Sequence, residues 1–430
     1  MNRIATALVL TLLASPALAD AVTYKGTIGD LPIVLELSEE PHAGNADLFG
    51  RYFYVNKGVD IPFHAAPAAR SRFGLAEEVA CSADTNNCPG AQDDPPGPAP
   101  LGARWALEIS RDGQSLEGHF AINGRNRPVR LERVGTRLFD PAGGTIALPE
   151  FANSLYWDGT LTPETSPYDY LKVTAVKLAA SDPVEMNGAS FHYVTDPRTK
   201  FRYPRLLDMS GYDIAPANAW LERRHWIMTL DALSCMAQQY QGFGWNGYNY
   251  DAGTLGWYDE EQVTVDYASS TVLSWTQSGS LSCGGAHPYN HIDIYNLDLV
   301  DGVPLDLSRI FRGWRPLNYD GTPADLETAR ANPRDYQWLP DAELATFVKE
   351  HRRTDAEMDV PSGEDGCPID ELIDTNLAIG FKDGDRVVFT LGGLPHVIFA
   401  CTAVLYETPI LDIAWLLTNE AENYFPSLAD

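Results

Sequence analysis

The sequence predicts an α+β protein in which an all-β, barrel-like meander precedes an antiparallel-sheet domain with helices on one face. Three observations predict this class. Short segments of alternating apolar and polar residues recur between Val22 and Thr136. A stretch rich in Gly and Pro follows at residues 138–167. Beyond it, a segment with helical spacing of apolar residues, Ala217–Tyr240, stands among further alternating segments. Strands grouped before mixed strands and helices are typical of α+β chains.

The N-terminus predicts an export signal over residues 1–19. A polar start with Arg3 precedes an apolar core, Ile4–Ala14, that is too short to span a bilayer. Ala17 and Ala19 form the small-x-small cleavage pattern, so the mature chain is expected to begin at Asp20. The alternative is a buried N-terminal helix. No later run of ~18 apolar residues exists, so we expect no transmembrane segment and a periplasmic or secreted protein.

The first domain is expected over residues 20–137. Tyr24–Leu37 alternates around a Gly-Asp turn and predicts a hairpin. A second hairpin is expected around the turn Asn56–Gly58, and the chain from Ala65 to Leu101 is expected to be a long loop. The remaining expected strands are Trp105–Ile109, Leu116–Phe120 and Pro128–Glu132. Residues 138–167 are expected to link this domain to the next.

The second domain is expected over residues 168–430. Its first strands are expected at Tyr170–Leu178, Ala189–Val194 and Phe201–Leu206, before the helix Ala217–Tyr240. A second helix is expected at Asp341–Arg352, because an Asp begins it and basic residues end it. Asp412 is expected to open a short last helix. The other expected strands are Gln262–Tyr267, Thr271–Thr276, His291–Leu299, Leu377–Phe381, Arg386–Thr390 and His396–Leu405.

The formal net charge is −28, and loss of Arg3 with the signal would make it −29. Nucleic-acid binding requires a basic surface, so this charge argues against a nucleic-acid partner. It favours long-range attraction to cationic partners, although an acidic surface is also compatible with solubility alone. Hydrophobic residues make up 44% of the chain, which indicates a globular rather than a disordered protein.

Six cysteines are present, and an even number after an export signal predicts three disulfides. Cys81 and Cys88 are expected to pair because they would close a small loop. For the others, the sequence favours Cys235–Cys283 and Cys367–Cys401 among the possible pairings. No C-x-x-C motif occurs, so neither a zinc ribbon nor a thioredoxin-type site is predicted.

A Gly-Gly-Ala-His turn, Gly284–His287, lies between two expected strands. Adjacent glycines allow a bulge that re-aims the next side chain. His287, Tyr289, His291 and Asp293 would share one face if the segment is extended, and they include the residue types of a metal or acid–base cluster. The alternative is that the glycines and His287 are structural, with His287 bonded to the backbone. Pro288 and Asn290 favour a turn.

Aromatic rings are concentrated in residues 242–258, among Gly and Asn residues. Exposed rings beside amide groups are typical of surfaces that bind a sugar or a protein. The alternative is a hairpin whose rings cover the preceding helix. The acidic runs Asp259–Glu261 and Glu364–Asp365 are most simply solvated surface charge. The candidate binding rings are Trp245, Tyr248, Tyr250 and Trp257.

The order of segments around the Gly-Gly-Ala-His turn resembles a domain of unknown function of exported bacterial proteins. It occurs in a lysozyme-sensing anti-sigma factor (RsiV) and a peptidoglycan deacetylase (PdaC), where it is not the catalytic domain. The resemblance covers residues 168–417 and rests on Gly284, Gly285, Ala286, His287, Asp298, Gly302 and the run Leu305–Phe311. The N-terminal part is similar to a small exported β-module through Gly50, Tyr52, Tyr54, Leu107, Glu108 and Gly118.

This resemblance and the charge predict a non-enzymatic envelope protein without a cofactor or a bound metal. Its expected ligand is a cationic protein such as lysozyme, or a peptidoglycan fragment. The alternative is a hydrolase of cell-wall polymer that uses His287, His291 and Asp293. Gly-x-Ser-x-Gly, His-Glu-x-x-His, the P-loop and the dinucleotide Gly pattern are all absent from the sequence, so no residue is assigned as catalytic.

Overall fold

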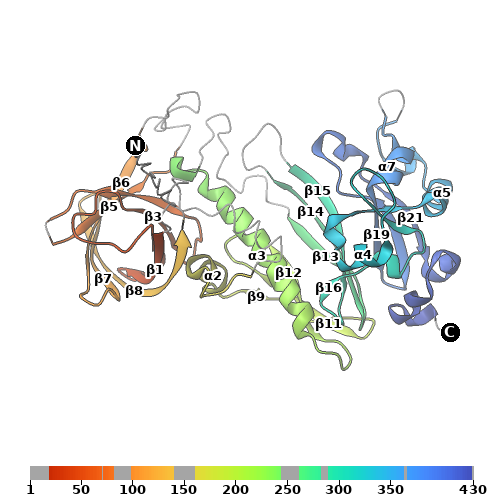
Figure 1. Cartoon of the computed structure of the whole chain (residues 1–430), viewed down its shortest axis with the longest axis horizontal. Helices are drawn as coiled ribbons and strands as arrows, with labels where there is room; N and C mark the ends of the chain where they lie inside the picture. Colours follow the sequence, from red (N-terminus) through yellow and green to blue (C-terminus); the bar gives the residue numbers. More distant parts are fainter. Residues whose placement is uncertain are drawn as a thin grey trace, which may run out of the picture. The chain divides into compact units, whose positions relative to one another are not determined.

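A computed structural model describes residues 19–69, 71–81, 98–139, 160–243, 261–281, 289–362 and 366–428. The chain forms two compact units (Figure 1). The first unit comprises Met1–Val176 with Ala237–Gly247, and the second comprises Lys177–Met236 with Tyr248–Asp430. The expected export signal, except for its last residue, lies outside the described residues.

The first unit contains a closed antiparallel barrel, which confirms the barrel-like meander expected from the sequence. Each strand pairs with the next along the chain, and the first pairs with the last to close the wall. A closed wall leaves no unpaired strand edge. The strands are β1 (Ala19–Ile28), β2 (Leu31–Leu37), β3 (Phe49–Tyr54), β4 (Ile61–Ala66), β5 (Phe73–Glu78), β6 (Leu101–Ile109), β7 (Ser115–Ile122) and β8 (Arg125–Phe139).

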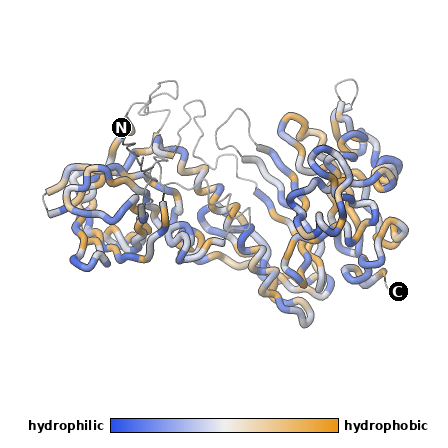
Figure 2. The backbone as a smooth tube through the Cα atoms, viewed as in Figure 1, coloured by the Kyte–Doolittle hydropathy of each residue, from blue (hydrophilic) through white to orange (hydrophobic). Residues whose placement is uncertain are grey.

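Alternating apolar residues of these strands fill the barrel. Leu35, Tyr52, Trp105 and Leu131 are all at most 2% exposed and belong to one core cluster. The same alternation is visible along the backbone in Figure 2. Strand β5 lies within Ala65–Leu101, which was expected to be a loop, so that prediction was wrong at residues 73–78. The sequence of β5, Phe-Gly-Leu-Ala-Glu-Glu, lacks the β-branched residues typical of strands. Glycine is required at position 74 of this strand, because a Cβ there would lie only 2.4 Å from the Ala66 carbonyl oxygen.

Helix α2 (Pro167–Thr174) overlaps the segment Tyr170–Leu178, where the sequence predicted a strand, and this prediction was wrong. Pro167 occupies the first turn, where a missing N–H costs no hydrogen bond. Tyr168 packs on Val34 and Phe53 on the outer side of the barrel wall. Tertiary packing therefore overrides the strand preference of Val173 and Thr174. The first unit extends to Val176 because α2 packs on the barrel.

Six buried charges attach α2 to the barrel, three of each sign, and we call them the charge latch. Arg51 donates to Glu36 (2.9 Å), Asp60 (3.1 Å) and Asp169 of α2 (2.9 Å). Lys172 of α2 lies 2.6 Å from Asp60, and Arg137 donates to Glu36 over 2.6 Å. Buried charges are costly unless they are paired and well oriented. The latch therefore fixes where α2 lies on the wall.

The described residues of the second unit form four antiparallel sheets. The expected strands around residues 189–206, 262–299 and 377–390 are all present. The strands are β9 (Ala179–Ala180), β10 (Val184–Met186), β11 (Ala189–Thr195), β12 (Arg202–Asp208), β13 (Gln262–Ala268), β14 (Val272–Leu281), β15 (Tyr289–Asp298), β16 (Val303–Pro304), β17 (Trp314–Leu317), β18 (Gln337–Pro340), β19 (Leu377–Lys382), β20 (Arg386–Leu391) and β21 (Val404–Pro409).

Two of the three helices expected in this unit are present as α3 (Ala215–Ala237) and α5 (Ala342–His351). The third was expected to open at Asp412, but Asp412 lies inside a 3₁₀ helix that begins at Ile410, directly after Pro409. Asp341 caps α5, since its carboxylate accepts from the backbone N–H groups of Glu343 and Leu344. The other helices are α4 (Leu326–Ala331), α6 (Asp355–Met358), α7 (Ile369–Asn376) and the 3₁₀ turns η2 (Gln241–Phe243), η3 (Leu307–Arg309), η4 (Pro333–Asp335), η5 (His396–Cys401), η6 (Ile410–Leu416), η7 (Asn419–Asn423) and η8 (Pro426–Leu428).

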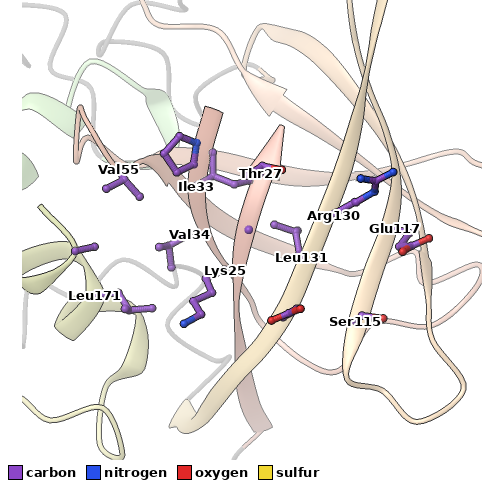
Figure 3. Close-up of a pocket in the computed structure, with 14 residues that line it drawn as sticks. Lys25, Thr27, Ile33, Val34, Val55, Ser115, Glu117, Arg130, Leu131 and Leu171 are labelled. Atoms are coloured by element: carbon purple, nitrogen blue, oxygen red, sulfur yellow. The ribbon is translucent and has the colours of Figure 1, made fainter. Parts of the chain in front are cut away.

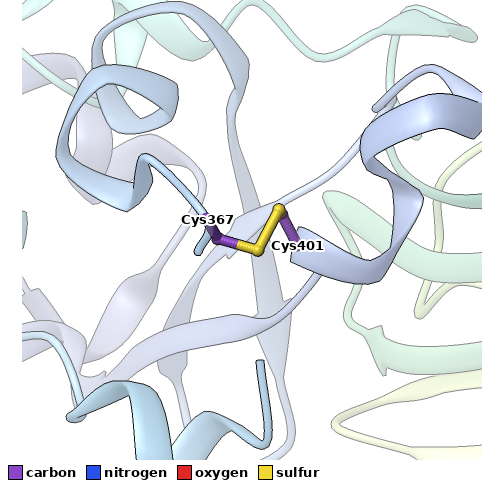
Figure 4. Close-up of a disulfide and its surroundings, with 2 residues drawn as sticks. All are labelled: Cys367 and Cys401. Carbon is purple, nitrogen blue, oxygen red and sulfur yellow. A yellow bond between two sulfur atoms is a disulfide. The ribbon is translucent and has the colours of Figure 1, made fainter. Parts of the chain in front are cut away.

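The strand predicted at His396–Leu405 was wrong for most of its length. Residues His396–Cys401 form η5, and β21 begins only at Val404. Cys401 is tied to Cys367 by a disulfide, the pair that the sequence favoured (Figure 4). Cys81 and Cys235 are also disulfide-bonded, and their expected partners, Cys88 and Cys283, lie outside the described residues.

Two hydrophobic cores organise the second unit. Helix α3 packs on the sheet β13–β16 through residues such as Leu221, Met228 and Trp275. Helices α5 and α7 contribute to a second core with the sheet β19–β21 through residues such as Leu344 and Ile373. None of the helices in the described ranges combines the length and the apolar character that crossing a bilayer requires.

Candidate functional site

The candidate site lies on one face of the sheet β13–β16, where β15 carries His291 and Asp293. Strand β15 is extended from Tyr289 onward, so the two side chains share a face. This agrees with the extended alternative from Tyr289 onward, including Asn290, whereas Pro288 lies outside the described residues. In the register of β14 and β15, Gly279 is opposite His291 and Gln277 is opposite Asp293.

His291 is held between two carboxylates. Its Nδ1 lies 3.0 Å from Asp293 Oδ2, and its Nε2 lies 2.9 Å from Glu261 Oε2. Gln277 donates to the other oxygen of Glu261 over 2.6 Å. Gly279 makes this arrangement possible, because a Cβ there would lie 2.1 Å from Glu261 Oε2 and 3.1 Å from His291 Nε2. We call Glu261, Gln277, His291 and Asp293 the His291 cluster.

The charge state of His291 follows from these contacts. Burial disfavours the imidazolium, but the hydrogen bonds with Asp293 and Glu261 outweigh burial and raise the pKa of His291 to about 9. The ring is therefore protonated at neutral pH, and both of its nitrogens are engaged. A general base must be unprotonated near the working pH, so this imidazole is poorly suited to accept a proton from a substrate.

The same face continues towards α3 with aromatic residues. The Trp275 and Tyr295 rings stack with centroids 5.3 Å apart. Arg224 of α3 donates to the Tyr295 hydroxyl over 2.8 Å and lies over the Tyr295 ring, 4.9 Å from its centroid. The polar row on β15 therefore borders a packed aromatic layer.

The structure brings together two members of the predicted His-Asp group, His291 and Asp293. The side chain of Tyr289 and the other predicted residues lie outside the described residues, namely Gly284, Gly285, Ala286 and His287 of the turn and Trp245, Tyr248, Tyr250 and Trp257 of the aromatic segment. Their roles stay predictions. Within the described ranges, no group of three His, Cys, Asp or Glu residues is placed to hold a metal ion.

Glu261 and Gln277 were not among the site residues predicted from the sequence. Glu261 ends an acidic run that was interpreted as solvated charge, yet its side chain is only 3% exposed. The strand register explains why Glu261 reaches His291. Val263 is opposite Gln277, so Glu261, two residues before Val263, lies at the level of Gly279. A glycine between a Glu and a His on three adjacent strands indicates a close contact across the middle strand.

A second feature of this unit is an exposed apolar pair on η6. Leu411 is 58% exposed and Trp415 is 50% exposed, and the exposed Asp412 lies beside them in the sequence. The Trp415 ring packs edge-on against Phe347, with centroids 5.7 Å apart. Trp415 is thus held in place on one side and open on the other.

No model of a known protein family matches the chain, and none of the curated proteins matches it.

Proposed function

We propose that this is an exported, non-enzymatic protein of the cell envelope that binds a cationic protein, with lysozyme as the first candidate. The proposal rests on the concentration of negative charge in the second unit. The second unit contains 17 Lys and Arg and 38 Asp and Glu, a formal charge of −21 out of −28 for the chain. Such a field attracts a basic partner and accelerates its association.

Export is supported by the signal pattern of residues 1–19 and by the disulfide Cys367–Cys401. Structural disulfides form and persist in oxidising compartments such as the periplasm or the extracellular space. Peptidoglycan fragments remain the second ligand class, which the aromatic segment 242–258 suggests from its composition.

The His291 cluster supports binding rather than catalysis. The alternative hydrolase would use His291 as an acid or a base, but the raised pKa and the two carboxylate contacts keep its proton in place. An imidazolium bonded to Asp293 of its own strand and, across β14, to Glu261 before β13 is instead suited to fixing the sheet. The hydrolase alternative therefore has no support from His291 and Asp293, the two described residues of its predicted site.

Charge alone gives promiscuous binding that salt removes, so a specific site also needs an anchor. Trp415 offers one, because Trp residues in the centre of interfaces often dominate the binding energy. The exposed Asp412, three residues earlier on η6, matches a partner that presents a basic residue beside an apolar contact.

The test is calorimetric titration of the mature protein with hen lysozyme at low and at physiological salt. Cytochrome c serves as a basic control of similar size. The proposal predicts that lysozyme binding weakens but persists at physiological salt, whereas cytochrome c binding is lost. Equal binding of both proteins at low salt, with neither binding at physiological salt, would refute the proposal, because a screened acidic surface alone explains that result.

A further inference from the structure

The outer wall of the barrel carries a pocket of about 550 Å³ beside α2 (Figure 3). This volume lies within the range of sites for small ligands. Apolar side chains from β2, the chain after β3 and α2 line one side, namely Val34, Val55 and Leu171. Charged and polar side chains from β1, β7 and β8 line the other. Figure 3 shows the apolar group and the charged group at opposite ends of the pocket, with Lys25 between them.

The strand register arranges the polar side as two rows across the wall. Lys25 is opposite Glu132, which is opposite Ser115. The second row lies two residues away on each strand, where Thr27 is opposite Arg130, which is opposite Glu117. Residues two apart on a strand point to the same face, so both rows face the pocket. Positive and negative side chains thus alternate along β8 and across β1, β8 and β7.

These four charges are available to a ligand. Lys25, Glu117, Arg130 and Glu132 are all exposed, and none lies within 4.0 Å of an opposite charge among the described residues. Among the described residues of this unit, the ion pairs are formed by other side chains, above all those of the charge latch, and Arg72 lies 3.8 Å from Glu108. Because the latch fixes α2, it also fixes Leu171, so the apolar side of the pocket is already formed before a ligand arrives.

A second pocket of about 530 Å³ adjoins the first, and both are lined by Ser115, Glu117 and Arg130. Arg72, Arg111 and Glu108 extend the mixed charges along this second pocket. We call these two adjoining pockets, which are lined by residues of several strands, the groove. A groove with shared lining residues suits an extended ligand rather than a compact one.

We propose that this groove binds a short peptide that carries both free ammonium and free carboxylate groups and an apolar side chain. Lys25 and Arg130 would pair with the carboxylates, and Glu117 and Glu132 would pair with the ammonium groups. The apolar side chain would rest on Leu171 and Val34. A polyanion would meet Glu117 and Glu132, and a polycation would meet Lys25 and Arg130, so neither matches the alternating pattern.

The test is calorimetric titration of the mature protein with the tetrapeptide Ala-Glu-Lys-Leu with free termini. We expect a dissociation constant of about 1 mM or lower. The double variants Lys25→Ala/Arg130→Ala and Glu117→Gln/Glu132→Gln are each expected to weaken binding at least about tenfold. Arg125→Ala is the matched control, since Arg125 is exposed on the β7–β8 hairpin and lines neither pocket; it should bind as the unmodified protein does.

Surface substitutions of this kind leave folding intact, which equal melting temperatures will verify. A second ligand, acetyl-Ala-Gln-Gln-Leu amide, has the same length and no charge, and it should not bind. The proposal is overturned if the charged peptide does not bind, if both double variants bind it as well as the Arg125→Ala control, or if the uncharged peptide binds equally. Lysozyme binding by the double variants is expected to be unchanged, so this site and the proposed function fail or hold separately.

Discussion

Replacing His291 with Gln tests whether the His291 cluster stabilises the fold through a protonated ring. Gln is polar and similar in size to His, but it carries no positive charge. Glu261 and Asp293 would lose the cation that lies between them, and Glu261 is buried on its other side against Gln277. We expect the variant to fold and to have a lower unfolding free energy than the wild type. The difference in unfolding free energy should depend on pH.

The magnitude follows from the pKa of His291, which rises from 6.5 to about 9 in the folded protein. A raised pKa stabilises the fold fully below the unfolded value of 6.5, and this contribution disappears as the pH rises through 9. Each pKa unit corresponds to about 1.4 kcal/mol, so the unscreened limit is about 3 kcal/mol. Because the ring is partly reached by solvent, screening reduces this to about 1–2 kcal/mol near neutral pH.

The assay is urea unfolding of the wild type and of His291→Gln at about pH 6 and about pH 9.5. The difference in unfolding free energy should be about 1–2 kcal/mol at the lower pH and should nearly vanish at the higher. His192→Gln is the control, because His192 makes no hydrogen bond to a carboxylate within the described residues. A stability difference for His291→Gln that stays constant across this pH range would show that the charge of His291 does not stabilise the fold, since lost packing alone would produce it.

Three further predictions concern the remaining features. Asp60→Asn removes the carboxylate that Lys172 and Arg51 share, and it should cost about 3–5 kcal/mol in urea unfolding, whereas Glu39→Gln outside the latch should cost little. Thiol titration of the denatured, unreduced mature protein should find no free thiol, and Cys401→Ser, which opens a loop of 34 residues, should lower the unfolding free energy by about 4 kcal/mol. Trp415→Ala should weaken lysozyme binding by about 2 kcal/mol in calorimetry, while Tyr319→Ala, at a residue 71% exposed, should leave it unchanged.

The sequence was sufficient to predict the elements whose patterns are local. The strands of the barrel core follow from the alternation of apolar residues, and α5 follows from Asp341 at its start and basic residues at its end. The failure at α2 has a tertiary cause. Helix α2 contains β-branched residues and is helical because Tyr168, Asp169 and Lys172 bind the barrel wall, which no local pattern reveals.

The candidate site likewise contains one contact that the sequence predicts and one that it does not. His291 and Asp293 are two residues apart, so their shared face could be predicted from the strand period alone. Glu261 is 30 residues from His291 and reaches it only across Gly279 of the strand between them. The raised pKa, which decides what the ring can do, depends on that distant carboxylate and so could not be predicted from the sequence.

Hydrogen exchange of the mature protein with and without saturating lysozyme, at physiological salt, locates the binding surface. We expect slowed exchange in the second unit, centred on residues 410–416, where Trp415 and Asp412 lie. We also expect unchanged exchange in the barrel strands β1–β8. Protection confined to the barrel, or no protection at any lysozyme concentration, would contradict the claim that the acidic second unit is the binding surface.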